Sequence, residues 1–594
     1  MRPLSVPSRA LQGARPPLTL TSIGRRRFLH SKPYDVAVIG GGITGLTAAY
    51  RLSKDPSCSK ITLYEKASRV GGWISSEKIP VPGGEAVFEY GPRTLKTNDY
   101  ACNALIDLLV DLDLMDDVAF VSRDAPSAIN RYLYYPDHLV RVPTPDPHLS
   151  GTENLINTVP PLLREPVFKT VLRSILTEPF KDPIDREKHA DDESIKDFIS
   201  RRFSPEVAEN LVSAMIGGIY GGSIDRLSAQ TTMGGLRDYE QFMEGIILST
   251  MNNAKRGVRY SQVDYALVME SVAPEKDSLY WKALRAAYQK SSVLYFKDGM
   301  GHLTETLATQ LKASGKVEFL LDADISKIAK EKNDDIVITS GERGRTHNRV
   351  IATHAPSALV QQLDPKVSRD TIANLKENNT AATIMVVNLY FDQPNLVPVK
   401  GFGYLIPRST PTEQNPEQAL GVIFGSEGSG GQDTAPGTKL TVMMGGYWWD
   451  GLKETDYPDH DTAVARACSL LQRHLGITDT PVVARTRLQQ NAIPQYTVGH
   501  LSRMGELSQS VRRDFNKRLT LAGSWYGTSG VGAVDCIRQG YLAASFGVGA
   551  RKLGPGDGKR VWRRFDYQDW ELEGGLASAP IRHAEMHPDE CRHF

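Results

Sequence analysis

The stretch that decides the fold is DVAVIGGGITGLTAAYRLSK, residues Asp35–Lys54. Val36, Val38 and Ile39 form a short apolar run, which is typical of a buried strand in a parallel sheet covered on both faces. Gly40, Gly42 and Gly45 then fit the spacing G-x-G-x-x-G. The first glycine allows a sharp turn, the second lets a pyrophosphate approach the backbone, and the third lets the following helix pack closely on the strand. The stretch therefore predicts a dinucleotide site at the N-terminus of that helix, with an ordinary glycine-rich turn as the alternative.

An acidic residue follows at the distance that this site requires. The next predicted strand, KITLYEK, carries Glu65 at its end, twenty positions after Gly45. A carboxylate there accepts hydrogen bonds from the ribose hydroxyls of a bound dinucleotide. Because this residue is Glu rather than Arg or Lys, the sequence argues against a 2′-phosphate and therefore against NADP. A solvated acid at the end of a strand is the alternative.

Two further glycine turns indicate a flavin rather than NAD. They are RVGGWISS, residues Arg69–Ser76, and FEYGPRT, residues Phe88–Thr94. A flavin ring must pass the pyrophosphate and lie under close backbone contact, whereas an NAD domain has no need of these turns. Near the other end of the chain, LTLAGSWYGTSGVGAVDCIRQG (Leu519–Gly540) predicts a strand, a glycine turn and a helix that begins near Val531. The N-terminus of that helix would stabilise negative charge at the flavin, so the nucleotide domain is expected to be discontinuous in sequence.

Composition limits the function classes. With 594 residues, of which 40% are hydrophobic, the chain is long enough to bury two or three cores. Lys and Arg number 70 against 69 Asp and Glu, and no basic stripe suggests nucleic-acid binding. The five cysteines show neither C-x-x-C nor metal-ligand spacing, so they are expected to be reduced and structural, and no metal site is predicted. No apolar run is long enough to predict a membrane-spanning helix of the usual kind.

Residues 1–32 have the composition of a mitochondrial transit peptide. They contain seven Arg and Lys residues, several Ser and Leu, and no Asp or Glu. A disordered basic tail is the alternative. We exclude this segment from the fold, and we assign no structure or role to residues 553–594.

The remaining chain divides into three predicted units. The nucleotide domain comprises residues 33–122, 290–360 and 515–552. Residues 145–285 carry apolar residues at helical spacing and are expected to form helices. Residues 123–144 and 361–514 are expected to form a second, mixed sheet, and its junction with the nucleotide domain would hold the substrate. Within the nucleotide domain, VEFLLDADISKIAK (317–330) predicts a hairpin-like pair of strands.

Several of these segments resemble a known family. The Gly40–Gly45 turn, VGGW, GPRT and LAGSW…AVDCI are similar to the FAD-dependent amine-oxidase superfamily. Within it, four stretches resemble the protoporphyrinogen oxidase family of haem biosynthesis: NRYLYYP (Asn130–Pro136), GGIYGGSIDRLSAQ (Gly217–Gln230), GFGYLIP (Gly401–Pro407) and IPQYTVGH (Ile493–His500). The last two are the most specific, and the resemblance extends from about Tyr34 to Leu553.

The resemblance implies an α/β fold with three parts: a glutathione-reductase-like FAD domain with a Rossmann-type parallel sheet, a mixed-sheet substrate domain and an α-helical membrane-associating domain. It implies oxygen-dependent oxidation of protoporphyrinogen IX to protoporphyrin IX by successive hydride transfers to FAD, with release of hydrogen peroxide. It further implies a peripheral contact with the mitochondrial inner membrane on its intermembrane-space side, and it leaves open a homodimer and a hand-over of product to ferrochelatase. Another FAD oxidase, acting on amines or carotenoids, and a binding protein that has lost its flavin are the alternatives.

The resemblance also assigns site residues. FAD, held noncovalently, is expected to contact Gly40, Gly41, Gly42, Ile43, Thr44, Gly45, Glu65, Trp73, Gly91, Pro92, Arg93, Ile325, Ser524, Val531, Gly532 and Ala533. Arg131 is expected to pair with a substrate propionate. Phe402 and Leu405 are expected to clamp the macrocycle, and Gly218 to touch it through its backbone. A surface ion pair, sheet-core packing and a helix end are the ordinary alternatives for these four residues. Arg93 is expected near the phosphates or the ring, outside the substrate site, and no side chain is assigned as a catalytic acid or base.

Overall fold

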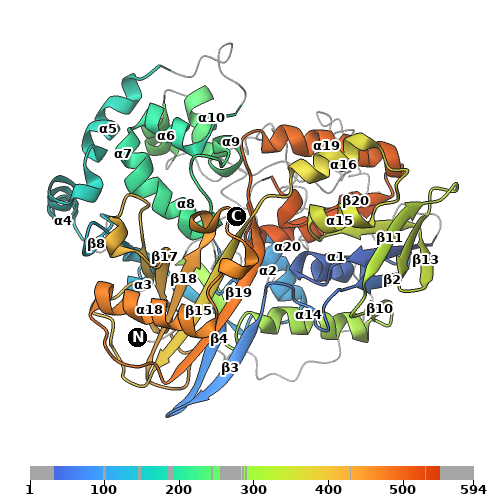
Figure 1. Ribbon diagram of the computed structural model, residues 1–594, viewed down its shortest axis with the longest axis horizontal. Helices are drawn as coiled ribbons and strands as arrows, with labels where there is room; N and C mark the ends of the chain where they lie inside the picture. The colour runs from blue at the N-terminus through green and yellow to red at the C-terminus, as the bar shows by residue number, and fades with distance from the viewer. Residues whose placement is uncertain are drawn as a thin grey trace.

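The computed structural model describes most of the chain between residues 33 and 548 (Figure 1). The described residues are 33–97, 102–144, 149–182, 192–242, 245–253, 282–283, 287, 290–428, 430–528 and 530–548. The predicted transit peptide, residues 1–32, and the tail, residues 553–594, lie outside them, as does part of the predicted helical region.

A five-stranded parallel sheet forms the centre of the nucleotide domain (Figure 1). In spatial order its strands are β10 (Val317–Leu320), β2 (Cys58–Tyr64), β1 (Tyr34–Ile39), β14 (Arg349–Ala352) and β20 (Leu519–Leu521). All neighbouring pairs run parallel. The central strand β1 buries side chains on both faces, as its apolar run predicts. The Rossmann-type sheet is confirmed, and it is assembled from segments far apart in the sequence.

One face of this sheet is covered by α1 (Ile43–Ser53), α2 (Cys102–Asp111), α14 (Gly301–Ala313) and α20 (Ala533–Leu542). Val38 of β1 points to this side and shares a hydrophobic core with Leu46 of α1 and Ile537 of α20. Because Gly540 has no side chain, α20 packs closely on α1: a Cβ there would lie 2.7 Å from the carbonyl oxygen of Thr44. The two helices that follow the predicted glycine turns are therefore neighbours.

The opposite face is covered by α15 (Pro356–Gln362), α16 (Arg369–Glu377) and α19 (His500–Phe515). Leu375 of α16 and Met504 of α19 share a hydrophobic core with Ile39 of β1 and Leu521 of β20. Both helices lie within residues 361–514, which were predicted to belong to the mixed-sheet domain. The boundary differs because the apolar sides of these amphipathic helices pack on the nucleotide sheet instead.

Residues 317–330 do not form the predicted hairpin. β10 is an edge strand of the parallel sheet, whereas β11 (Ile325–Lys330) pairs with β12 (Ile336–Ser340) in a separate antiparallel sheet that β13 (Arg343–His347) completes. Between β10 and β11 the chain turns at Asp322, which has a left-handed φ of 52°. The apolar pattern located both strands correctly, but tertiary packing decides their partners.

A seven-stranded mixed sheet forms a second layer (Figure 1). In spatial order it contains β19 (Val483–Pro494), β15 (Ala381–Phe391), β18 (Thr438–Gly445), β17 (Ala419–Phe424), β16 (Gly403–Leu405), β7 (Tyr132–Tyr134) and β8 (Leu139–Arg141). β16 and β7 run parallel, and the other neighbouring pairs run antiparallel. α18 (His460–Leu475) packs on the outer face of the sheet. The predicted mixed sheet is confirmed, and residues 123–144 contribute its last two strands.

Two smaller sheets accompany these layers. The hairpin of β3 (Ser76–Val81) and β4 (Gly84–Glu89) packs Phe88 against Tyr390 of the mixed sheet. A three-stranded sheet contains β5 (Leu95–Lys96), β9 (Ser291–Phe296) and β6 (Val118–Ser122). β4 leads directly into the predicted GPRT turn, so the hairpin places that turn between the nucleotide domain and the mixed sheet.

The described part of residues 145–285 is largely helical, as predicted. It contains α4 (Gly151–Arg164), α5 (Val171–Thr177), α6 (Ile195–Arg202), α7 (Pro205–Val207), α8 (Ser213–Tyr220), α9 (Ala229–Thr232), α10 (Gly234–Phe242) and α11 (Ile246–Asn253). Among the described helices, none combines the length and the apolar character needed to cross a membrane.

Buried charges hold these helices together. Glu178 and Arg202 form an ion pair in which both side chains are almost fully buried. Glu178 also accepts the N–H groups of Ile246 and Ile247 at 2.9 and 3.0 Å, so it caps the N-terminus of α11. Burial acts to raise the pKa of the Glu178 carboxyl, but the hydrogen bonds from Arg202 and α11 outweigh it and hold the pKa below its usual range.

Candidate active site

The glycine turn between β1 and α1 has the geometry of a phosphate-binding turn. Gly40 has a left-handed φ of 104°, which residues with a side chain rarely adopt. A Cβ on Gly45 would lie 2.0 Å from the carbonyl oxygen of Gly40, so glycine is required for α1 to pack this closely on β1. Among the described residues, a Cβ on Gly42 would meet nothing nearer than the Cα of Gly72, at 4.0 Å. Gly42 also N-caps α1 without a side-chain hydrogen bond, which leaves open space beside the helix N-terminus.

Backbone groups hold Glu65 in place. Its carboxylate accepts the N–H of Gly41 at 2.6 Å and the N–H of Ala67 at 2.8 Å. Its carbonyl oxygen accepts the N–H of Ala323 at 2.9 Å, which brings the start of β11, at Ile325, close to Glu65. The structure therefore places both predicted residues, Glu65 and Ile325, at the same end of the parallel sheet as the glycine turn.

The RVGGW segment closes against the glycine turn. Gly71 donates its N–H to the carbonyl oxygen of Gly41 at 2.8 Å. The Arg69 guanidinium donates to three carbonyl groups of its own loop at 2.7 to 3.1 Å, which fixes the shape of the segment. Trp73 is 45% exposed, and a Cβ on Gly91 would lie 2.1 Å from its carbonyl oxygen, so the GPRT turn passes directly beside it. Arg69 was not singled out from the sequence, because its carbonyl partners are brought together by the folded loop alone.

The C-terminal turn supplies a second helix N-terminus. α20 begins at Ala533, close to the predicted start, and its N-cap, Gly532, makes no side-chain capping bond. Thr44 of α1 donates its hydroxyl to the carbonyl oxygen of Cys536 at 3.1 Å, which ties the first turns of both helices together. Ser524 lies in a short 3₁₀ turn between β20 and α20.

These elements fit a flavin dinucleotide. The N-terminus of α1 favours a pyrophosphate, and that of α20 favours negative charge on the flavin, since neither helix has a side-chain cap. Glu65 suits a ribose, and the glycine turns let a flat ring approach the backbone. The residues predicted to contact it are Gly40 to Gly45, Glu65, Trp73, Gly91, Pro92, Arg93, Ile325, Ser524, Val531, Gly532 and Ala533, and their contacts with the cofactor stay a prediction. Across the part of the chain that the structure describes, no group of three or more His, Cys, Asp or Glu residues could hold a metal ion.

The predicted substrate residues lie at one end of the mixed sheet. Leu405 packs on α8 so closely that a Cβ on Gly218 would lie 2.5 Å from its Cδ2 atom. Phe402 donates its N–H to the carbonyl oxygen of Asn130 at 3.3 Å, which brings it next to Arg131. The Arg131 side chain is exposed and makes no ion pair or hydrogen bond within the described part of the chain. The arrangement leaves its guanidinium available to a ligand.

Arg93 lies in a cavity beside the mixed sheet. Its Nη1 donates to the Thr441 hydroxyl at 2.7 Å, and burial lowers the pKa of Arg93 to about 10. Glu89, Phe402 and Lys439 line the same cavity, where burial raises the pKa of Glu89 and lowers that of Lys439. Arg93 was predicted to lie outside the substrate site; in the structure it shares a cavity with Phe402, which is a predicted substrate residue. Arg93 belongs to the GPRT turn, residues 91–94, which is predicted to contact the cofactor. It therefore connects this turn with the predicted substrate region.

Comparison with known proteins agrees with this geometry. Residues 43–545 match the family of flavin containing amine oxidoreductases. The chain is 32% identical over 527 residues to the protoporphyrinogen oxidase of Schizosaccharomyces pombe, which covers 86% of this chain and 97% of that protein. It is 30% identical over 511 residues to the human protoporphyrinogen oxidase, with the same shares covered. The chain belongs to the protoporphyrinogen oxidase family.

Solved structures share the fold. A putative protoporphyrinogen oxidase from Exiguobacterium aligns with a TM-score of 0.64 at 20% identity, covering 87% of this chain and 98% of that one. The cyclohexylamine oxidase of Brevibacterium oxydans aligns with a TM-score of 0.54 at 15% identity, covering 86% and 98%. As a member of the protoporphyrinogen oxidase family within the flavin containing amine oxidoreductases, the protein is an FAD-dependent oxidase, and the predicted cofactor is confirmed.

In this member of the protoporphyrinogen oxidase family, cross-strand register reveals a row of neighbouring residues that the sequence did not. Five successive register partners, one on each of five strands, form what we name the inner-face row: Leu405, Gly421, Met443, Val386 and Arg487. α8 covers the Leu405 end through Gly218. At the other end, the Arg487 guanidinium lies 3.9 Å from the centre of the Tyr90 ring, directly before the Gly91 turn. The inner-face row therefore runs from Leu405, which is predicted to clamp the substrate, to the turn at Gly91, which is predicted to contact the cofactor.

Proposed function

We propose that this chain oxidises protoporphyrinogen IX to protoporphyrin IX and passes the electrons to dioxygen. In each two-electron step the substrate loses a hydride from a meso carbon and one proton, while dioxygen takes up two electrons and two protons to become hydrogen peroxide. Over the three steps the protons come from two pyrrole nitrogens and from one meso carbon. Bound FAD supplies the acceptor for the hydride. The names of the relatives support this substrate, and they share most of their length with this chain.

The observation that carries the proposal is the inner-face row. A porphyrinogen is a wide apolar ring with carboxylates at its edge, so it needs a broad apolar surface that reaches the flavin. Leu405, Met443 and Val386 provide apolar side chains along the row. Gly421 lies between Leu405 and Met443 in the register and adds no side chain to the surface. Arg487 and Tyr90 end the row at the cofactor turn. A ring lying along this row would have one edge at the flavin and another near Phe402 and its neighbour Arg131.

An aerobic assay tests the proposal. The purified holoenzyme should convert colourless protoporphyrinogen IX into fluorescent porphyrin, with hydrogen peroxide formed in parallel. Gly42→Val, which is expected to lack the cofactor, measures the background of autoxidation. Porphyrin formation no faster than in Gly42→Val, together with peroxide formation from an amine substrate, would show that the protein is a different oxidase of the superfamily.

Arg131→Ala is expected to raise the KM for protoporphyrinogen about ten- to hundredfold. A charge-assisted hydrogen bond contributes roughly 1.5–3 kcal/mol, which corresponds to that change in binding. Because this anchor acts on ground and transition states alike, kcat should fall less than kcat/KM. Arg131→Lys should recover part of the loss, since an ammonium cannot reproduce the two parallel bonds of the guanidinium. Steady-state kinetics and flavin content are the measurements.

Arg141 offers a matched control for Arg131. It is an exposed arginine on the neighbouring strand β8, opposite Tyr132 in the register. Arg141→Ala removes the same charge from the same edge of the sheet and should leave KM unchanged. Equal effects of both substitutions, or loss of flavin from Arg131→Ala, would show that Arg131 does not bind the substrate.

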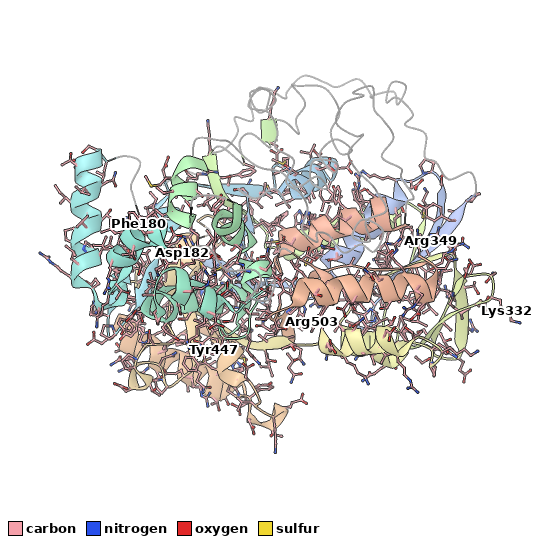
Figure 2. All side chains as sticks on the ribbon, turned by 90° about the horizontal axis from the view of Figure 1, so that it is seen from above. Phe180, Asp182, Lys332, Arg349, Tyr447 and Arg503 are labelled. Atoms are coloured by element: carbon pink, nitrogen blue, oxygen red, sulfur yellow. The ribbon has the colours of Figure 1, made fainter. Side chains whose placement is uncertain are left out.

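We further propose that the protein is imported into mitochondria and that its helical region contacts the inner membrane from the intermembrane space. The acid-free basic leader supports the import. Large apolar side chains are exposed on the helical region: Leu155, Ile156 and Leu163 of α4, with Leu176, Phe180 and Met251. Figure 2 shows Phe180 at the opposite end of the molecule from Lys332 and Arg349 of the nucleotide domain. Met215 and Ile219 are also exposed on α8, the helix that carries Gly218, so apolar surface extends to the substrate region.

Two measurements test this location. Deleting residues 1–32 should leave the protein in the cytosol, and continued import would contradict the leader. The double substitution Leu176→Glu and Phe180→Glu should abolish co-sedimentation with vesicles of phosphatidylcholine and cardiolipin. Leu321→Glu, which alters an apolar residue of similar chemistry exposed on the nucleotide domain, serves as the control. Equal binding of all three proteins would rule out the helical region as the contact.

A further inference from the structure

A network of buried side chains joins the turn between β20 and α20, which is predicted to contact the cofactor, to the helix α8 on the substrate side of the site. It centres on the IPQYTVGH segment, in which Gln495 contacts the end of α8, while Tyr496 and His500 contact the turn between β20 and α20. The Tyr496 side chain is almost fully buried and stacks on His500, with 4.2 Å between the ring centres. The segment was recognised from the sequence as specific to the family, but no role followed from the sequence.

On the cofactor side, Tyr496 and His500 hold the turn between β20 and α20. The Tyr496 hydroxyl donates to the carbonyl oxygen of Ser524 at 2.6 Å and lies 3.2 Å from that of Gly530. His500 Nε2 lies 2.8 Å from the carbonyl oxygen of Gly527, and since a carbonyl can only accept, Nε2 carries the proton. Burial lowers the pKa of His500 to about 4, so the ring is neutral at physiological pH and this hydrogen bond sets its tautomer.

The contact with this turn leaves no room for an additional atom. A Cβ on Gly527 would lie 2.8 Å from the Tyr496 hydroxyl oxygen. The φ angle of Gly527 is −76°, which any residue adopts. The Tyr496 hydroxyl, rather than the backbone conformation, is therefore what requires glycine at position 527.

On the substrate side, the same segment is bonded to the chain around α8. The Tyr496 carbonyl accepts the N–H of Ser228 at 2.8 Å. The Gln495 side-chain amide donates to the carbonyl oxygen of Tyr220 at 2.8 Å, and a Cβ on Gly222 would lie 2.1 Å from Gln495 Oε1. Tyr220 is the last residue of α8, the helix whose Gly218 packs on Leu405. The residues that hold the turn between β20 and α20 are thus fixed to α8, the helix that covers the Leu405 end of the inner-face row.

We propose that Tyr496 is a positioning residue which, together with His500, fixes Ser524, Gly527 and Gly530 relative to α8. It holds the turn between β20 and α20 at a set distance from the inner-face row, along which we propose that the substrate lies. Neither side chain contacts the substrate or the reacting atoms in this role. The proposal concerns the binding of FAD, which follows from family membership, so its test does not depend on the identity of the substrate.

Tyr496→Phe tests the proposal, because it removes the hydroxyl and keeps the ring. Titration of the full-length, deflavinated protein with FAD should give a Kd about three- to tenfold higher than in the wild type, the equivalent of one lost hydrogen bond. The visible circular dichroism of the bound flavin should change as well. Tyr390→Phe is the matched control: Tyr390 is equally buried and its hydroxyl accepts the N–H of Gly437 at 2.9 Å, within the mixed-sheet domain. It should lower the Tm to a similar extent without altering the FAD Kd or the flavin spectrum.

Gly527→Ala tests the same contact from the other side. The new methyl group meets the Tyr496 hydroxyl, and we expect the FAD Kd to rise about tenfold or more. The double variant with Tyr496→Phe should bind FAD better than Gly527→Ala alone, because the clashing oxygen is absent. If Tyr496→Phe matches Tyr390→Phe in FAD affinity and flavin spectrum, or if the two losses simply add, the proposal is wrong. Should Tyr496→Phe fail to fold, a wild-type FAD affinity in Gly527→Ala would contradict it by itself.

Discussion

Gly45→Ala is expected to leave no folded nucleotide domain. The methyl group would lie 2.0 Å from the carbonyl oxygen of Gly40 and 3.2 Å from a methyl group of Val38, both inside the unit of β1 and α1. The nearer atom belongs to the backbone of a left-handed turn, so it cannot move aside as a flexible side chain would. We expect a loss of more than about 3 kcal/mol, a large part of the stability of a typical domain. The soluble yield and the thermal unfolding curve measure it.

Gly42→Val is the contrasting variant, three residues away in the same turn. Its side chain enters the open space beside the N-terminus of α1, where the described residues offer no close contact. We therefore expect a Tm near that of the wild-type apoprotein and no flavin absorbance after purification. Full flavin occupancy in Gly42→Val would place the pyrophosphate elsewhere, and a stable Gly45→Ala would mean that α1 can shift along β1.

Glu178→Ala is expected to destabilise the helical region by about 3–5 kcal/mol. Removing Glu178 takes the nearest carboxylate away from Arg202, which is 1% exposed and whose other acidic partner, Glu240, lies 3.7 Å away. The N–H groups of Ile246 and Ile247 lose their acceptor at the same time. Urea unfolding followed by far-UV circular dichroism measures the loss. Glu165→Ala is the control, because its partner His138 is half exposed and such pairs contribute little.

The same carboxylate predicts a pH dependence. The pKa of Glu178 is lower in the folded state than in an unfolded chain, so its contribution is complete at neutral pH and is lost as the pH falls through the folded-state value. Between neutral pH and acid pH, the wild type should therefore lose more stability than Glu178→Ala. Parallel unfolding free energies of the two proteins across that range would contradict the assignment of the shift.

The sequence predicted those features of the fold that depend only on residues close together in the chain. β1, the glycine turn and α1 follow from a run of about 20 residues, and Gly40 and Gly45 have the turning and packing roles that their spacing suggested. The pairing of residues 317–330 was wrong, because an apolar pattern identifies a strand without naming its partner. The packing of α16 and α19 on the nucleotide sheet was missed for the same reason, since a helix pattern shows that a face is buried but not against what.

In the candidate site, too, the sequence did not reveal which distant residues lie together. Glu65 was found by its distance from the glycines, and Phe402, Leu405 and Gly218 by resemblance. Arg69 acts on carbonyl groups that the folded loop brings together, and the cavity around Arg93 forms between strands far apart in sequence. The inner-face row depends on the register of five strands, which no spacing within one segment encodes.

The distribution of the cofactor domain along the chain has a consequence for biosynthesis. β20 and α20 come from residues 519–542, yet they complete a sheet and a phosphate-binding face whose first strand begins at residue 34. A ribosome must therefore translate nearly the entire message before the pocket for the cofactor exists. FAD therefore cannot bind to the completed pocket before residues 519–542 have been made, and slow, non-local assembly belongs to the maturation of the enzyme. A premature stop codon anywhere before this segment yields an apoprotein, however much of the catalytic chain precedes it.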